Sequence, residues 1–124
     1  MSKKKSFKVW WDEKDGIIQT QIFGLNNEQD VINTVSKIAE IKQKFPGKKL
    51  RDFIDLSQAS KPSSRARKVI AEKIYKDPDL KRIALVSKSL INKTIQNFLI
   101  RATSESDKIK MFDTKKEALK WLKE

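Results

Sequence analysis

The sequence predicts an α/β domain built on a single open, mostly parallel five-stranded sheet, with an N-terminal antiparallel hairpin and four helices. Three observations lead to this class. Asp15-Gly16, between two strand-like segments, is a strong hairpin signal. Strand-like and helix-like segments then alternate, as they do where right-handed crossovers join parallel strands. Residues 83–86 form a short, continuous apolar run, which is typical of a central parallel strand.

The predicted order of elements is β-β-α-β-α-β-α-β-α, and it opens on two segments rich in aromatic and β-branched residues. These segments are residues 7–12 (FKVWWD) and 16–23 (GIIQTQIF). Alternation along the second strand predicts one face with Ile18, Thr20 and Ile22, and an opposite face with Ile17, Gln19, Gln21 and Phe23. Trp10 and Trp11 are neighbours on the first strand, so they point to opposite faces, and core or edge packing is expected of both.

The middle of the chain is predicted to form a helix, a strand and a second helix. Their expected bounds are residue 26 or 27 to 45, 50–56, and 63–75. Asn26 or Asn27 can cap the first helix with a side-chain oxygen. Pro46 and Pro78 follow the two helices, and proline cannot continue a helix.

The last part of the chain is predicted to add a strand at 81–87, a helix over 91–102, a strand at 108–112 and a helix from 113 to 122. The third helix has apolar residues at helical spacing, which predict its buried face: Ile91, Ile95, Phe98, Leu99 and Ala102. Thr114 and Glu117 have the spacing of a capping box at the start of the last helix.

Length and composition indicate one domain, expected over residues 7–124, after a disordered basic segment at 1–6. With 38% hydrophobic and 35% charged residues, the 124-residue chain reads as globular and soluble. No apolar run approaches the roughly 20 residues of a membrane-spanning helix. The basic start leads into no signal-peptide core, so a cytoplasmic location is expected.

The chain contains no cysteine and no histidine, which restricts its chemistry. The usual zinc ligands, the thiol nucleophile and the commonest general base are therefore missing. Asp52 and Asp55 are three apart on a predicted strand and so lie on opposite faces, which argues against a shared Mg²⁺ site. They are interpreted as a strand-end charge and a loop-fixing acceptor. We expect no enzyme, no metal site and no cofactor.

The net charge is +12, and residues 46–92 carry 12 basic and 5 acidic residues. Such a charge can attract nucleic acid, anionic lipid or an acidic partner. The alternative interpretation is a lysine-rich, solvated surface. Recognition of nucleic acid is disfavoured, because neither a glycine-rich phosphate loop nor an aromatic pair accompanies the basic residues.

The best candidate site follows the third strand, at the sheet edge where sites of open α/β domains gather. If Ser63 or Ser64 begins the second helix, its hydroxyl caps free backbone N–H groups. A phosphate there, bound or covalent, would then face Arg65 or Arg67. The alternative is an ordinary helix start with solvated arginines. Candidate partner-contact residues in the same loop are Ser57, Ser60 and Lys61.

Three stretches resemble a known superfamily. DLSQASKPSS, residues 55–64, resembles the segment of STAS domains in anti-anti-sigma factors that runs Asp-Leu-Ser, a spacer, then Asp-Ser-Ser-Gly. Laid on without gaps, the phosphorylated serine of that pattern falls on Ser64, and Ser63 replaces the second aspartate. RIALVSKS (82–89) and KIKMFDTKKEALKWL (108–122) are similar to the C-terminal half of the SpoIIAA-like branch.

The resemblance implies a STAS-like fold and a non-catalytic regulatory or binding module that contacts a kinase or another regulatory protein. It implies Ser64 as the phosphoacceptor, in a phosphoswitch that is vestigial or modified. Some relatives bind small or apolar ligands, so the second hypothesis is a small-ligand or lipid-binding protein with an apolar pocket between sheet and helices. Candidate lining residues for that pocket are Trp11, Ile95, Phe98 and Leu99.

Overall fold

A computed structural model describes residues 6–24 and 27–124 and confirms the predicted fold class. Five strands form one sheet in the order β1-β2-β3-β4-β5. The strands are β1 (Phe7–Asp12), β2 (Ile17–Gly24), β3 (Leu50–Ala59), β4 (Leu80–Val86) and β5 (Ile109–Phe112). The helical elements are α1 (Glu28–Lys42), α2 (Ser64–Val69), the π-helix η1 (Ile70–Tyr75), α3 (Leu90–Ala102) and α4 (Lys115–Lys123). β1 and β2 pair antiparallel, and the other neighbours pair parallel.

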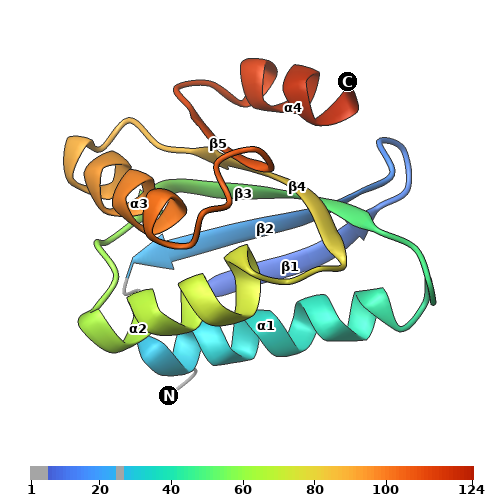
Figure 1. The fold of residues 1–124 in the computed structure, drawn as a ribbon, viewed down its shortest axis with the longest axis horizontal. Coiled ribbons are helices and arrows are strands. Elements are labelled where there is room, and N and C mark those ends of the chain that lie inside the picture. Colours follow the sequence, from blue (N-terminus) through green and yellow to red (C-terminus); the bar gives the residue numbers. More distant parts are fainter. Residues whose placement is uncertain (1–5, 25–26) are drawn as a thin grey trace.

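The helices are divided unequally between the two faces of the sheet (Figure 1). Along the chain from β2 to β5, each new strand is added at the same edge of the sheet. Because the connections between these parallel strands are right-handed, α1, α2 and α3 all lie on one face. The larger core lies there, with members such as Ile18, Val31, Ile54, Ile74, Leu85 and Leu99. α4 covers the opposite face over a smaller core of Ile17, Phe53, Ala84, Val86, Ala118 and Leu122. β4 is therefore covered on both faces, as its apolar run predicts.

The opening hairpin and its two faces are confirmed. Gly16 takes a positive φ of 65°, a conformation that glycine adopts without strain, and its N–H donates to the carbonyl of Asp12 at 2.8 Å. Ile18 lies in the larger core and Ile17 in the smaller one, as alternation along the strand requires.

Two predicted helix starts are also confirmed. The side chain of Asn27 accepts a hydrogen bond from the N–H of Asp30, and the hydroxyl of Thr114 accepts one from the N–H of Glu117. The alternative cap, Asn26, lies outside the described residues, as do residues 1–5 of the segment expected to be disordered. Ser6, the last residue of that segment, accepts a hydrogen bond from the N–H of Phe23 at 2.7 Å.

β3 is longer than the predicted strand 50–56 and runs to Ala59. β2 continues beside it after a register shift between Gln21 and Phe23, and Phe23 then pairs with Gln58. Because pairing with β2 continues, Ser57 lies on the strand, and the connection to α2 shortens to residues 60–63.

The second helix occupies the predicted span but changes type within it. α2 passes at Ile70 into the π-helix η1, which ends at Tyr75. π-helical turns are rare and often occur at functional sites. η1 presents Ile70, Ile74 and Tyr75 to the larger core.

The predicted buried face of α3 is wrong in part. Ile91 and Phe98 are 59% and 64% exposed, although Leu99 is buried as expected. The residues that face the sheet from α3 include two amides, Asn92 and Gln96, which are 3% and 1% exposed. Both amides have hydrogen-bond partners from other elements, which periodicity in one sequence does not reveal.

Candidate functional site

The loop 60–63 lies at the carboxyl end of β3, where the sequence predicts the site (Figure 1). Its position is fixed from two directions. The N–H of Ser60 donates to the carbonyl of Gly24 at the end of β2, at 2.7 Å. The side-chain amide of Asn92 on α3 donates to the carbonyl of Ala59 at 3.0 Å. Hydrogen bonds therefore hold the loop and the end of β3 against the end of β2 and against α3.

The two adjacent serines have different roles. Ser63 is the N-cap of α2, with φ −64° and ψ 164°, and its Oγ accepts from the N–H of Ala66 at 3.1 Å. Ser64 is the first residue of the helix and is exposed. Ser63 is exposed as well, but the Ser64 hydroxyl forms no hydrogen bond within the described part of the chain, so it is the one of the pair without a capping role.

Basic groups lie around these serines. Arg67 is half-buried, and its Nε donates to the carbonyl of Pro62 at 3.1 Å, while Arg65 and Lys61 are exposed. A shallow depression of about 330 Å³ is lined by Asn27, Ser60, Lys61, Pro62, Ser63, Ser64 and Arg67. The structure thus brings five of the predicted site residues to one depression, but not Ser57 on β3 or Arg65.

Ser63→Ala is expected to destabilise the protein by about 1 kcal/mol, because the Ala66 N–H loses its acceptor at the start of α2. Ser64→Ala is the matched control. It alters the neighbouring exposed serine without removing a cap, and its effect on the free energy of unfolding should stay within about 0.5 kcal/mol. Urea denaturation of both variants measures the difference. Equal losses would show that Ser63 does not cap the helix.

Asp55 and Asp52 are separated by the sheet, as their spacing predicts. The carboxylate of Asp55 accepts from the N–H of Ser57 at 2.9 Å, but Ser57 lies on β3, so this bond is made within the strand and does not fix the loop. Asp52 is not a strand-end charge, because it is 0% exposed and faces the larger core. A signal for this was present: Asp52 alternates with Leu50, Ile54 and Leu56, which share its face.

Asp52 has an unusual environment for a carboxyl group. Its Oδ1 accepts from the hydroxyl of Thr20 at 2.9 Å, and its buried Oδ2 has no hydrogen-bond partner among the described residues. Burial disfavours the charged form and raises the pKa of Asp52 to about 7; the Thr20 hydrogen bond opposes this rise, and the charge of Asp77 adds to it. Asp52 therefore changes its charge near neutral pH.

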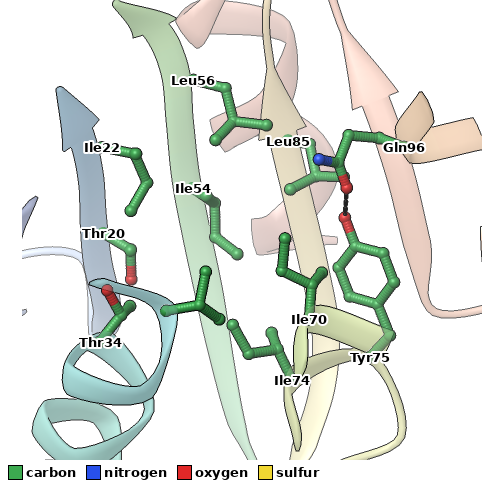
Figure 2. A pocket seen from close by; sticks show the side chains of 11 residues that line it. Thr20, Ile22, Thr34, Ile54, Leu56, Ile70, Ile74, Tyr75, Leu85 and Gln96 are labelled. Atoms are coloured by element: carbon green, nitrogen blue, oxygen red, sulfur yellow. Dashed lines mark hydrogen bonds between the residues drawn. The ribbon is translucent and has the colours of Figure 1, made fainter. Parts of the chain in front are cut away.

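A small apolar cavity of about 30 Å³ lies between the sheet and the helices (Figure 2). Its lining comprises Thr20, Ile22, Val31, Thr34, Ile54, Leu56, Ile70, Ile74, Tyr75, Leu85 and Gln96. Figure 2 shows Tyr75 and Gln96 on one side, where the buried tyrosine hydroxyl donates to the glutamine side-chain oxygen. Burial raises the pKa of Tyr75, and the charge of Asp52 raises it further. The cavity has room for one or two water molecules.

None of the four predicted ligand-lining residues lines this cavity. Trp11 packs on Phe45, with ring centroids 4.4 Å apart. Leu99 is buried and Ile95 is half-buried against the larger core. Phe98 faces solvent. The structure therefore does not bring these side chains together around one cavity.

Residues 6–24 and 27–124 contain neither a cluster of metal-binding carboxylates nor a membrane-spanning helix. No group of three or more aspartate and glutamate side chains lies close enough together to hold a metal ion. Within the same residues, no helix has the length and apolar character needed to cross a membrane.

Comparisons with known proteins agree with the architecture. A family model described as a domain of unknown function, DUF7793, matches residues 11–124. An uncharacterised protein of the DUF3478 family with a SpoIIAA-like fold, from Shewanella loihica PV-4, is similar in structure, with a TM-score of 0.67, 16% identity and 98% of each chain covered. An anti-sigma factor antagonist from Mycobacterium paratuberculosis gives a TM-score of 0.68 and 17% identity over 100% of both chains. No curated protein sequence matches. The chain thus has a SpoIIAA-like fold.

Proposed function

The chain belongs to the DUF7793 family, and from this premise we propose that it is a non-catalytic STAS-like regulatory module that acts through contacts with a protein partner. The observation that carries the proposal is the loop 60–63 with the start of α2. It holds an exposed serine beside basic groups, on a scaffold that resembles an anti-sigma factor antagonist. The absence of histidine and cysteine supports a role without catalysis.

The proposed contact surface comprises the depression and its rim. Ser64 is the candidate phosphoacceptor, because the hydroxyl of Ser63 already accepts the Ala66 N–H. Lys61 and Arg67 line the same depression, so a phosphate on Ser64 would lie near two cations. Phosphorylation would reverse part of the local charge and so change which partner binds.

Ser64→Asp is expected to reduce retention of a protein partner about tenfold relative to wild type, whereas Ser64→Ala retains it, because only the first variant adds a charge at the proposed contact. A pull-down from a lysate of the source organism, quantified by mass spectrometry, measures this. Ser36→Asp, which changes an exposed serine on α1, is the matched control.

The phosphoswitch is tested separately by measuring the intact mass of the native protein. The wild type should carry the added mass of one phosphate, and the Ser64→Ala variant should not. Partner retention that is equal in the Ser64→Asp and Ser36→Asp variants would contradict the proposed contact surface. A native pool without phosphate under several growth conditions would remove the phosphoswitch and leave the partner contact standing.

The second hypothesis, a small-ligand or lipid-binding protein, has less support. The cavity between sheet and helices measures about 30 Å³, whereas pockets for small molecules are typically about 300 to 1,000 Å³. Its polar groups are also engaged, since the hydroxyls of Thr20, Thr34 and Tyr75 all donate within the protein. A lipid would require α1, η1 or α3 to move away from the sheet.

A further inference from the structure

An apolar stripe on α3 faces solvent. Leu90, Ile91 and Phe98 are 78%, 59% and 64% exposed, and Ile32 on α1 is the one other large apolar side chain of the described residues that reaches 40%. Leu90 and Phe98 are eight residues apart and Ile91 and Phe98 seven, so all three project from one side of the helix. Exposed apolar side chains that gather in this way mark interaction sites more often than single ones do.

The orientation of α3 is fixed by the hydrogen bonds of its buried side. The Asn92 amide donates to the carbonyl of Ala59, and the Gln96 side-chain oxygen accepts from the Tyr75 hydroxyl. Rotation of the helix to bury the stripe would break both contacts and expose Leu99. Each broken contact would leave a buried polar group without a partner, at a cost of about 1–3 kcal/mol. The stripe is therefore exposed in the stable fold.

The charges around the stripe have one dominant sign. Residues 56–71 contain four basic and no acidic residues, and residues 87–102 contain three basic and no acidic residues. Asn92 joins these segments through its bond to Ala59. Lys88 precedes the stripe and Arg101 follows it, and both are exposed. Lys93 is the third basic residue of the second segment, but its charge is paired with Asp113, which leaves Lys88 and Arg101 beside the stripe.

This charge pattern indicates which kind of partner can bind the stripe. A second copy of the chain would bring the same basic residues against Lys88 and Arg101, and like charges across an interface are unfavourable. An acidic occupant pairs with them instead. We propose that the stripe Leu90–Ile91–Phe98 docks the apolar face of an acidic amphipathic helix of a protein partner, with carboxylates of that helix near Lys88 and Arg101. The inference rests on the proposed function, because it gives the partner a chemistry and a second contact surface.

The test uses a synthetic amphipathic helical peptide with leucines at i, i+3, i+4 and i+7 spacing and glutamates on its flanks, and a counterpart with lysines in place of the glutamates. The full chain is titrated with each peptide while backbone NMR shifts are recorded. The acidic peptide is expected to bind about tenfold more tightly than the basic one and to shift the signals of α3.

Phe98→Ser and Ile91→Ser should each weaken binding of the acidic peptide about tenfold, because each removes one large apolar contact. Both side chains are exposed, so the variants should retain the thermal midpoint of the wild type. Because the two substitutions are independent, a local distortion caused by one of them would not explain a loss of binding in both. Ile32→Ser removes an exposed isoleucine from α1 and is the matched control. It should leave binding within about twofold of wild type, as should Ser64→Ala at the start of α2.

Equal affinity for both peptides, or unchanged affinity for the acidic peptide in the α3 variants, would overturn the inference. Two results would assign the stripe to another occupant and overturn it as well. One is Phe98-dependent binding to phosphatidylglycerol vesicles without peptide binding, and the other is Phe98-dependent self-association measured by light scattering. If the acidic peptide fails to bind while Ser64→Asp still releases a partner, the inference falls and the proposed function stands. If Ser64→Asp retains the partner as well as wild type does, and the acidic peptide binds α3, the contact surface at the loop and the start of α2 is contradicted and the inference stands.

Discussion

Asp52→Asn is expected to stabilise the folded protein at pH 8 by about 2 to 4 kcal/mol, since a pKa shift of one unit corresponds to about 1.4 kcal/mol. Burial raises the pKa of Asp52 from 3.8 to about 7. Between these values the folded state holds a proton that the unfolded state has released, so stability falls as pH rises, and it levels off above about pH 7. Asparagine has no charge to bury, and it retains an acceptor for the Thr20 hydroxyl.

Urea denaturation at pH 5, 6, 7 and 8 measures this effect. The wild type should lose stability along the series, and Asp52→Asn should not. Asp55→Asn is the matched control, because it removes a carboxylate from the same strand on the opposite, half-buried face. A wild type that gains stability from pH 5 to pH 8, or an Asp52→Asn series parallel to it, would contradict the ionisation of a buried Asp52.

Leu122→Ala is expected to destabilise the protein by about 3 kcal/mol, within the usual range for removal of a fully buried leucine side chain. Leu122 is 0% exposed and packs in the smaller core with Phe53 and Ala84. The six buried residues of this core give little scope to refill the cavity, and α4 is the helix that covers it. Repacking should therefore relieve little of the loss.

Leu119→Ala on the same helix is the control, because Leu119 is only partly buried against this core. It should cost less than half as much in urea denaturation. Hydrogen exchange adds a local readout: amides of α4 should lose protection in Leu122→Ala before those of β4, whose other face still packs on the larger core. Equal destabilisation by the two variants would show that α4 does not depend on Leu122 for its packing.

Much of the fold is predictable from short-range signals. Alternation along residues 17–23, the Asp15-Gly16 turn and the caps at Asn27 and Thr114 each report a local preference that the tertiary structure retains. The position of the candidate site also follows from topology. Sites of open α/β domains lie at the carboxyl ends of the strands, so the loop after the third strand can be located once the order of strands and helices is predicted.

The features that could not be predicted depend on contacts between residues that are distant in sequence. The inward orientation of Asn92 and Gln96 depends on the Ala59 carbonyl and the Tyr75 hydroxyl, and both come from other elements. Without them, Ile91 and Phe98 look like part of a buried stripe. The length of β3 depends on a register shift in β2. The π-helical turn at Ile70 has no recognised signal in composition or periodicity.

The strand order has a consequence for how the chain assembles during synthesis. Strands that are neighbours in sequence are neighbours in the sheet, so each new strand can join the edge formed by the one before it. Loop closure then spans one crossover at a time, which limits its entropic cost. A ribosome-bound chain that has released residues up to α3 already carries most of the larger core. The smaller core closes last, when α4 folds over a sheet that is already formed.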